Sequence, residues 1–405
     1  MTRSAIAVTG MGLVGPGGIG VEANWQAALA GTATAAQDEA LAGLPVRISC
    51  RVPAFDADRA LGARQAHRLD RSSQFALLAA REAVADAGLD PGTWDGARTG
   101  VAFGTAGGGA GTFEAQHRTL LDEGPHRVSP LTLPMHLPNM VAGQLGIDLG
   151  ARGPNLTVST ACASAATAIQ TACDLLQLGR CDVVVTGGSD ALLTSVTMAA
   201  FAQMGALSRH TDPATASRPF DLHRDGFVAG EGAGVLVLER LSDAAARGAR
   251  VHGRIVGCGS TADAHHVTAP DPQGQGMEGA LRQALADADA APGDVDHVNA
   301  HGTSTPQNDR LETEMLRRVL PGDPPVTSAK GVMGHLLGAA GAMEAILTLR
   351  TLREQKIPAT ANLTTPDPAI RANVVAGRPL PHPMELAVSN SFGFGGQNAV
   401  LVLAR

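Results

Sequence analysis

Residues 156–164 (LTVSTACAS) decide how this chain is interpreted, because they join an apolar, β-branched run to the start of a helix. The run 156–160 predicts a buried strand and residues from Ala165 onward predict a helix, so Cys162 falls on the turn between them. A thiol at a helix N-terminus lies beside unpaired backbone N–H groups and the positive end of the helix dipole, which favour the thiolate. We therefore expect a nucleophile in an oxyanion-binding turn; the alternative is a small buried residue that packs the helix start.

Composition limits the class of protein. The 405 residues are 44% hydrophobic and 17% charged, which describes a globular chain long enough for two core-forming units. The net charge of -7 argues against a general nucleic-acid binder, and no run approaches the roughly 18 apolar residues of a membrane span. Residues 1–4 lead directly into a predicted strand rather than into a signal peptide, so we expect a cytoplasmic protein. Reduced thiols are expected because the five cysteines are scattered and lack C-x-x-C spacing: Cys50, Cys162, Cys173, Cys181 and Cys258.

Two glycine-rich stretches resemble phosphate-binding loops. Residues 10–15 (GMGLVG) match the dinucleotide fingerprint G-x-G-x-x-G after a strand at 5–9, but Pro16 and two further glycines break the helix that such a site requires. Residues 104–111 lack the Lys-Ser/Thr pair of a phosphate loop. We expect structural turns at both places, the second one closely packed, rather than nucleotide binding.

Strands and helices alternate along the chain in two successive series. The first has strands at 99–104, 156–160, 182–188 and 234–239 and helices at 72–88, 140–149 and 165–179. The second has strands at 254–257, 295–300, 386–389 and 399–403 and helices at 277–286, 309–320 and 341–353. Such alternation implies two α/β units with helices on both sheet faces. No linker separates them, so we expect one body of two similar halves, residues 1–250 and 251–405, with the site between them.

Three stretches of the second half carry chemically useful side chains at predicted strand ends. The first is 299–306 (NAHGTSTP) with His301, the second is 328–344 with Lys330, His335 and Glu344, and the third is the glycine-rich loop 389–398 (SNSFGFGGQN). Singly, each histidine fits a satisfied core residue. A nucleophile candidate with two histidines, a lysine and a glycine-rich loop indicates an active site.

In these stretches the chain resembles the β-ketoacyl-[acyl carrier protein] synthases, the elongating condensing enzymes of type II fatty-acid and polyketide synthesis. The segments TACAS (160–164), NAHGTSTP (299–306), Lys330 with GHLLGAAG (334–341) and NSFGFGG (390–396) follow the family's order. RPFD (218–221) and RDGF (224–227) match as well, so the resemblance covers nearly the whole chain. It implies an α/β, thiolase-like fold of duplicated halves in five layers (αβαβα), commonly dimeric.

The resemblance also implies roles. Cys162 takes the acyl group from acyl carrier protein, with the N–H groups of Cys162 and Phe394 as oxyanion hole, and both histidines donate to the malonyl thioester carbonyl during decarboxylation. Lys330 fixes His335, with Glu344 as its counter-ion; a buried structural ion pair is the alternative. Loss of carbon dioxide drives the condensation, so no metal, nucleotide or redox cofactor is expected. The substrate-binding residues implied are Ala106, Phe201, Thr303, Thr305, Phe392 and Phe394.

Departures from the family pattern concern the substrate. Ala106 stands where many fatty-acid members have a larger aliphatic residue, so a long or stiff polyketide or polyene chain is weighed equally with an ordinary fatty acyl group. Residues 67–74 look similar to polyketide ketosynthases. Basic residues fall where the family docks its acidic carrier protein, although scattered solvated charges are the alternative: Arg64, His67, Arg68 and Arg127.

Competing functions leave different residue patterns. A degradative thiolase needs a second catalytic cysteine near the C-terminus, yet no cysteine follows Cys258. A starter-unit enzyme uses a Cys, His, Asn set, and a chain-length factor lacks the nucleophile. A cysteine hydrolase of this fold does not explain Lys330 with His335. The partner in a dimer stays open: an identical subunit or a chain-length factor.

Overall fold

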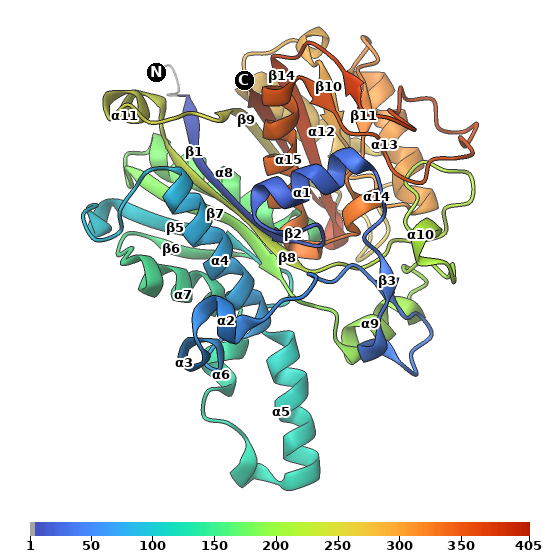
Figure 1. The fold of residues 1–405 in the computed structure, drawn as a ribbon. Helices are drawn as coiled ribbons and strands as arrows, with labels where there is room; N and C mark the ends of the chain where they lie inside the picture. Colours follow the sequence, from blue (N-terminus) through green and yellow to red (C-terminus); the bar gives the residue numbers. More distant parts are fainter. Residues whose placement is uncertain (1–4) are drawn as a thin grey trace.

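The computed structural model describes residues 5–405, and its first half is built on five strands (Figure 1). They are ordered β6-β5-β7-β8-β1 in the sheet. β5 is parallel to β6 and to β7, whereas β8 is antiparallel to both β7 and β1. Their bounds are β1 Ile6–Gly15, β5 Thr99–Gly104, β6 Asn155–Val158, β7 Val183–Asp190 and β8 Gly232–Arg240.

The second half repeats this arrangement. Its strands are ordered β11-β10-β14-β15-β9, so both halves follow the order third, second, fourth, fifth, first. The parallel and antiparallel pairs fall at the same places, and a short antiparallel pairing of β1 with β9 joins the halves into one 11-stranded sheet. The bounds are β9 Gly253–Ala262, β10 His297–Asn299, β11 Val326–Thr327, β14 Leu386–Gly393 and β15 Gln397–Ala404. The predicted duplication is confirmed.

Helices complete five layers. α8 (Ser164–Gln177) and α15 (Ala340–Glu354) pack against each other and against strands of both halves, so they form the middle layer. Almost every residue of α15 is buried, as in a helix that is covered on all sides. α4 (Arg71–Asp86) and α7 (Asn139–Leu149) cover the outside of the first half, and α12 (Gln275–Asp287) and α13 (Pro306–Val319) cover that of the second.

The remaining elements decorate this core. α5 (Ala110–Glu123) projects from the body as an arm, and α6 (Thr132–His136) lies on its return path (Figure 1). The other helices are α1 Val21–Ala30, α2 Ala57–Leu61, α3 Ala63–Ala66, α9 Ser195–Gln203, α10 Pro213–Ala216, α11 Leu241–Ala246 and α14 Lys330–Met333. The short strands are β2 Gly18–Ile19, β3 Ala36–Gln37, β4 Ile48–Ser49, β12 Lys356–Ile357 and β13 Leu380–Pro381. None of the helices within residues 5–405 has the length and apolar character needed to cross a membrane.

The turn predicted at residues 10–15 is wrong, because this segment continues β1 to Gly15. The glycines make room for α4 rather than for a turn. A Cβ at Gly10 would lie 2.0 Å from the Ala83 carbonyl oxygen, and one at Gly12 would lie 1.9 Å from that of Ala79. Glycine here therefore serves the close approach of helix and strand. The second expectation, a closely packed turn at residues 104–111, is confirmed for residues 105–109. Gly104 ends β5, and residues 110–111 begin α5.

The buried strand predicted at 156–160 is also wrong in its burial. β6 pairs with β5 alone, so it forms the edge of the sheet, and Leu156 is 41% exposed. A run of β-branched residues occurs in central strands and also in edge strands with an apolar surface, so the sequence pattern does not distinguish the two.

Candidate active site

A cavity of about 360 Å³ opens where the two halves meet, and it contains the three predicted reactive side chains. Cys162 comes from the turn between β6 and α8 of the first half. His301 follows β10, and His335 lies between α14 and α15, so both come from the second half. The structure thus brings together residues that are up to 173 positions apart, as the strand-end argument predicts.

Cys162 lies in a short 3-10 turn, Ala161–Ala163, that leads directly into α8. The backbone of Ala161 has a φ of +50°, a strained conformation for a residue other than glycine. Ser164 holds this turn, since its hydroxyl donates to the Ala161 carbonyl at 2.6 Å and accepts from the Thr160 N–H at 2.9 Å. The sequence therefore places the thiol at the helix start through a side-chain lock as well as through backbone geometry.

The resting thiol is not the thiolate that the helix position suggests. Burial raises the pKa of Cys162 to about 12, and the negative charge of Asp190 adds to this effect. Lys330 and the backbone N–H of Phe394 act on the pKa in the opposite direction but do not prevail. Because the Phe394 N–H faces the sulfur, and the loop at Phe394–Gly396 packs on the Cys162 turn, this amide is placed to face an oxyanion at that atom.

His335 is held as a neutral hydrogen-bond donor. The Leu337 N–H donates to its Nδ1 at 3.3 Å, so the ring proton belongs on Nε2. Burial, together with the charge of Lys330, keeps the pKa of His335 well below its usual range. The ring packs edge-on against Phe227, with centroids 5.4 Å apart. A neutral ring with a fixed Nε2–H can donate to a carbonyl oxygen in the cavity.

His301 is prepared in the same way by a different group. Lys330 Nζ lies 3.5 Å from its Nδ1, which leaves Nε2 to carry the proton. Burial, the Lys330 charge and His335 keep the pKa of His301 well below its usual range. The two histidine rings meet edge to face with centroids 5.3 Å apart. Two neutral donors therefore lie side by side opposite the thiol.

The ion pair of Lys330 and Glu344 is fully buried beneath these histidines. Burial raises the pKa of Glu344 to about 7, although Lys330 opposes the rise. Lys330 was expected to fix His335; its hydrogen bond goes to His301 instead, and the Leu337 amide serves His335. The two histidines therefore depend on separate supports.

Glu312 is a supporting residue that sequence reasoning missed. It lies on α13, is fully buried, and its carboxylate accepts the backbone N–H groups of His301 and Gly302, each at 2.8 Å. Asn390 donates to the same carboxylate at 3.0 Å. It lies on β14, because the loop predicted at 389–398 is instead a hairpin of β14 and β15 around the turn Phe394–Gly396. Burial raises the pKa of Glu312. The Glu312 carboxylate thus joins the segment after β10 to β14. This link is visible only in the tertiary structure.

The predicted substrate-binding residues divide into two groups. Thr303, Thr305, Phe392 and Phe394 line the cavity, and the two threonine hydroxyls lie 2.8 Å apart. Ala106 and Phe201 do not line it; they pack beside it in an apolar cluster around Leu192, Met198, Leu207 and Leu337. The cluster reaches the cavity through Phe227, and the Phe201 ring lies 6.4 Å from that of Phe394, centroid to centroid. The role of Ala106 and Phe201 stays a prediction.

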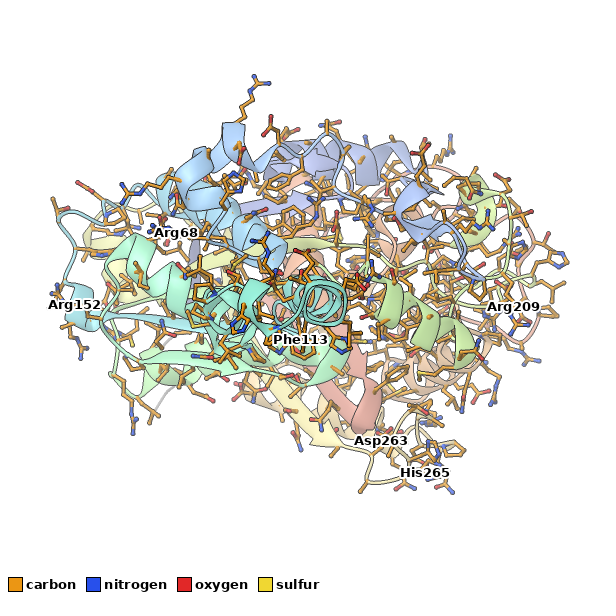
Figure 2. The ribbon with its side chains drawn as sticks, turned by 90° about the horizontal axis from the view of Figure 1, so that it is seen from below. Arg68, Phe113, Arg152, Arg209, Asp263 and His265 are labelled. Carbon is orange, nitrogen blue, oxygen red and sulfur yellow. The ribbon has the colours of Figure 1, made fainter. Side chains whose placement is uncertain are left out.

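The rim of the cavity joins the glycine-rich loop to residues 263–270. The N–H of Asp263 donates to the Gly396 carbonyl at 2.9 Å, and the N–H of Gly395 donates to the Val267 carbonyl at 2.8 Å. Asp263 and His265 lie at one edge of the molecule, away from Arg68 (Figure 2).

The basic residues predicted to dock a carrier protein lie on two elements. Arg64 and Arg68 line a surface hollow of about 610 Å³ between α3 and the α6–α7 region, with His67 beside them at the end of α3. Arg127 is elsewhere, on the 3-10 turn after α5, where it pairs with Glu123 at 3.1 Å. Across residues 5–405 no cluster of three or more His, Cys, Asp or Glu side chains is arranged to hold a metal.

The fold and the paired histidines facing a cysteine define a thiolase-like α/β enzyme. The family model for the "Beta-ketoacyl synthase, N-terminal domain" matches residues 3–244, and the model for the "Beta-ketoacyl synthase, C-terminal domain" matches residues 252–364. The chain is 42% identical over 406 aligned residues to 3-oxoacyl-[acyl-carrier-protein] synthase 2 of Staphylococcus aureus (strain COL), covering 99% of this chain and 98% of that protein. The chain belongs to the β-ketoacyl synthase family and is an acyltransferase-class enzyme.

Solved structures agree with this assignment. The ishigamide ketosynthase/chain length factor superimposes with a TM-score of 0.92 at 33% identity, covering 100% of this chain and 99% of that one. The type II PKS ketosynthase in AntDE:AntF, a complex with its acyl-carrier protein and bound to the hexaketide, gives a TM-score of 0.91 at 30% identity, with coverage of 100% and 99%. These neighbours confirm the predicted fold class.

Proposed function

We propose that this enzyme elongates an acyl chain by decarboxylative condensation with a malonyl group, both carried on acyl carrier protein. One observation carries the proposal: a thiol and two neutral histidines with free Nε2–H donors face one cavity. The relatives support it, because the Staphylococcus aureus protein is named as a 3-oxoacyl-[acyl-carrier-protein] synthase.

In the first half-reaction the sulfur of Cys162 attacks the acyl thioester. A carbon–sulfur bond to Cys162 forms, the bond to the carrier sulfur breaks, and the thiol proton leaves with the carrier thiol. The Phe394 N–H and the Lys330 charge oppose the effect of burial on the Cys162 pKa, so they stabilise negative charge at this site. The backbone N–H groups of Cys162 and Phe394 hold the tetrahedral oxyanion.

In the second half-reaction the malonyl carboxylate leaves as carbon dioxide, and its electron pair enters the thioester as an enolate. His301 and His335 donate their Nε2–H bonds to the enolate oxygen, where the charge develops. Since both rings are neutral and already oriented, no proton needs to move before this step. The enolate carbon then attacks acyl-Cys162, forms the new carbon–carbon bond and expels the Cys162 sulfur, which regains a proton. No metal, nucleotide or redox cofactor takes part in this sequence.

We place the phosphopantetheine arm along Thr303 and Thr305, beside Phe392, since the hydroxyl pair opens into the cavity. The surface hollow lined by Arg64 and Arg68, together with His67 and Arg127, offers positive charge to an acidic carrier protein. Within the described residues Cys50, Cys162, Cys181 and Cys258 form no disulfide, which suits the proposed cytoplasmic location.

A dimer is part of the proposal. The exposed edge of β6, the arm with its return path through α6, and α7 present apolar side chains of the kind that interfaces cover, namely Leu156, Phe113, Leu120, Leu121, Leu133, Leu137 and Ile147. An uncharged edge strand can pair with a copy of itself, which favours a homodimer. The likeness to the ishigamide ketosynthase/chain length factor favours a heterodimer as the second candidate. Native mass spectrometry and an activity assay distinguish the two. An active species of twice the chain mass supports the homodimer. A chain that is active only with a chain-length factor supports the heterodimer.

Substitution of Cys162 tests the reaction itself. Cys162→Ala should abolish acyl transfer, measured as the mass added to the intact protein by acyl carrier protein. Cys162→Gln should keep the decarboxylation of malonyl carrier protein, because its amide mimics the acyl-enzyme and leaves the histidines in place. Acylation that persists in the Ala variant would indicate another nucleophile, and a Gln variant that releases no carbon dioxide would contradict the role of the histidines.

A further inference from the structure

Asp190 joins the two halves of the molecule beside the site. It is the last residue of β7 and is fully buried. Its carboxylate accepts the Thr105 hydroxyl at 2.8 Å and the N–H groups of Ala106 at 3.0 Å and Gly107 at 3.2 Å, all from the loop after β5. It also accepts the Gly338 N–H at 2.7 Å, from the second half. All four partners are neutral groups, so the charge is stabilised by dipoles alone.

The contact to Gly338 lies next to the support of His335. The residue before it, Leu337, has a φ of +53° and donates its N–H to His335 Nδ1. Such a backbone persists only where its surroundings hold it. A Cβ at Gly338 would lie 2.4 Å from Asp190 Oδ2, so this turn is pressed onto the carboxylate. Asp190 therefore holds the strained turn that fixes the tautomer of His335.

The contacts to the other loop reach the first half of the site. Asp190 fixes Thr105 to Gly107, the loop that contains Ala106. The Thr105 carbonyl lies 3.4 Å from the hydroxyl of Ser164, the side chain that holds the Cys162 turn. One carboxylate is thus shared between the nucleophile side and the histidine side.

Retaining this charge is costly in a buried position. Burial raises the pKa of Asp190 to about 6, despite the hydrogen bonds that lower it, so the group is still ionised at pH 7. Its charge also raises the pKa of Cys162, which works against thiolate formation. A residue that is expensive to bury and unfavourable for the nucleophile has to contribute through what it orients.

We propose that Asp190 is a positioning residue that sets the orientation of His335 for decarboxylation and, through the same carboxylate, the shape of the loop at Thr105 to Gly107. The inference rests on the proposed function, since decarboxylation is the step that His335 assists. It adds a shared anchor between the histidine side and the acyl side.

The test uses decarboxylation in a Cys162→Gln background, where no acylation is needed. Adding Asp190→Asn replaces two acceptor oxygens by an oxygen and an NH2 group, which faces the existing donors. We expect kcat for carbon dioxide release from malonyl carrier protein to fall about 100-fold with little change in KM, because a small misplacement of a catalytic group costs about that much. Unchanged kcat would overturn the proposal. Failure of the Cys162→Gln parent to release carbon dioxide would instead overturn the proposed function.

Asp70→Asn is the matched control. Asp70 is buried to a similar degree and also accepts four hydrogen bonds from neutral groups, those of the N–H and hydroxyl of both Ser72 and Thr112, but it touches neither loop of the site. We expect it to lower the unfolding temperature without a 100-fold loss of kcat. Equal losses in both variants would show a merely structural role for Asp190.

Two further readouts keep the proposal testable. With Cys162 present, Asp190→Asn should lower the apparent pKa for alkylation of the thiol, because a nearby buried negative charge has gone. An unchanged or higher pKa would contradict a charged carboxylate between the two loops and so overturn the proposal. Should that variant not fold, Thr105→Val removes one donor and keeps the carboxylate. It should slow acylation by long chains roughly 10-fold and leave decarboxylation intact. Equal loss of both steps, or of neither, would overturn the proposal.

Discussion

The two halves of this enzyme share one strand order and differ in the chemistry placed at their strand ends. In the first half the connection after the third strand, from β6 to α8, carries Cys162. In the second half the corresponding connection, from β11 to α15, carries Lys330 and His335. A duplicated scaffold thus presents two equivalent edges to one cavity: the first half supplies the nucleophile and the second supplies both histidines and the Phe394 amide.

Most of the charged groups buried at the site belong to the second half; the first half contributes Asp190, which contacts both halves. The second half buries Lys330, Glu344 and Glu312 beneath the histidines, all fully removed from water. The Cys162 turn is instead fixed by the hydroxyl of Ser164 and by backbone geometry. The difference teaches that buried ions support His301, through Lys330 and Glu312, whereas His335 and the Cys162 turn are held directly by neutral hydrogen-bonding groups.

His301→Ala tests this division with the largest expected effect. The variant should still acquire an acyl group on Cys162, because the thiol and the oxyanion amides of Cys162 and Phe394 are untouched. It should lose decarboxylation on the order of 100-fold to 1000-fold, since one preorganised donor is gone. Intact-protein mass follows the first step and carbon dioxide release the second. A variant that fails to acylate but decarboxylates normally would reverse the roles given to the halves.

Much of the scaffold is predictable because its signals are local. The strand at 99–104 is predicted with the bounds that β5 has, and the helix at 72–88 matches α4 to within two residues. The failures arise where a local signal has two causes. Glycines at positions 10 and 12 are as compatible with a helix packed on a strand as with a turn. The arm helix α5 was not predicted, and none of its residues is buried.

The site residues also fall into those that the sequence predicts and those that only the structure reveals. The motifs predict that Cys162, His301, Lys330 and His335 meet, and the structure places them together. Glu312 and Asp190 were missed, because a single acidic residue in a helix or at a strand end has no motif. Their positions follow from the distance between loops of the folded chain, which pattern in the sequence does not encode. The lowered pKa expected for Cys162 is wrong because burial outweighs the helix terminus.

Ala106→Ile sharpens the comparison by asking whether the first half also holds the acyl tail. Three added carbons in the apolar cluster that Ala106 packs against should cost about 1 to 3 kcal/mol for long chains, roughly 5-fold to 150-fold in the acylation rate. Short chains should react almost as before. Acylation of Cys162 is followed by mass across a series of acyl carrier proteins. Equal slowing at every length would indicate a distorted backbone, and no slowing would place the tail elsewhere.

The smallest effect concerns the second strand of each half. β5 of the first half is lined by small and apolar residues, whereas β10 of the second carries His297, which is buried with no hydrogen-bond partner on either ring nitrogen within the described chain. Burial, with a smaller contribution from His382, lowers the pKa of His297 to about 3. The unfolded chain protonates this ring below about pH 6.5, but the folded chain does not, so this residue lowers stability as the pH falls from about 6.5 to about 3.

His297→Leu removes that dependence. At pH 5, 1.5 units below the unfolded pKa, the proton taken up only on unfolding should cost the wild-type protein about 2 kcal/mol, and at pH 8 it should cost nothing. The free energy of unfolding of the variant minus that of the wild type should therefore be about 2 kcal/mol larger at pH 5 than at pH 8. Urea unfolding at the two pH values measures this, and the difference cancels the change in packing, which is the same at both. If the free-energy difference between variant and wild type is the same at both pH values, His297 is protonated as easily in the folded protein as in the unfolded chain. The buried ring would then not be a feature that sets the second half apart from the first.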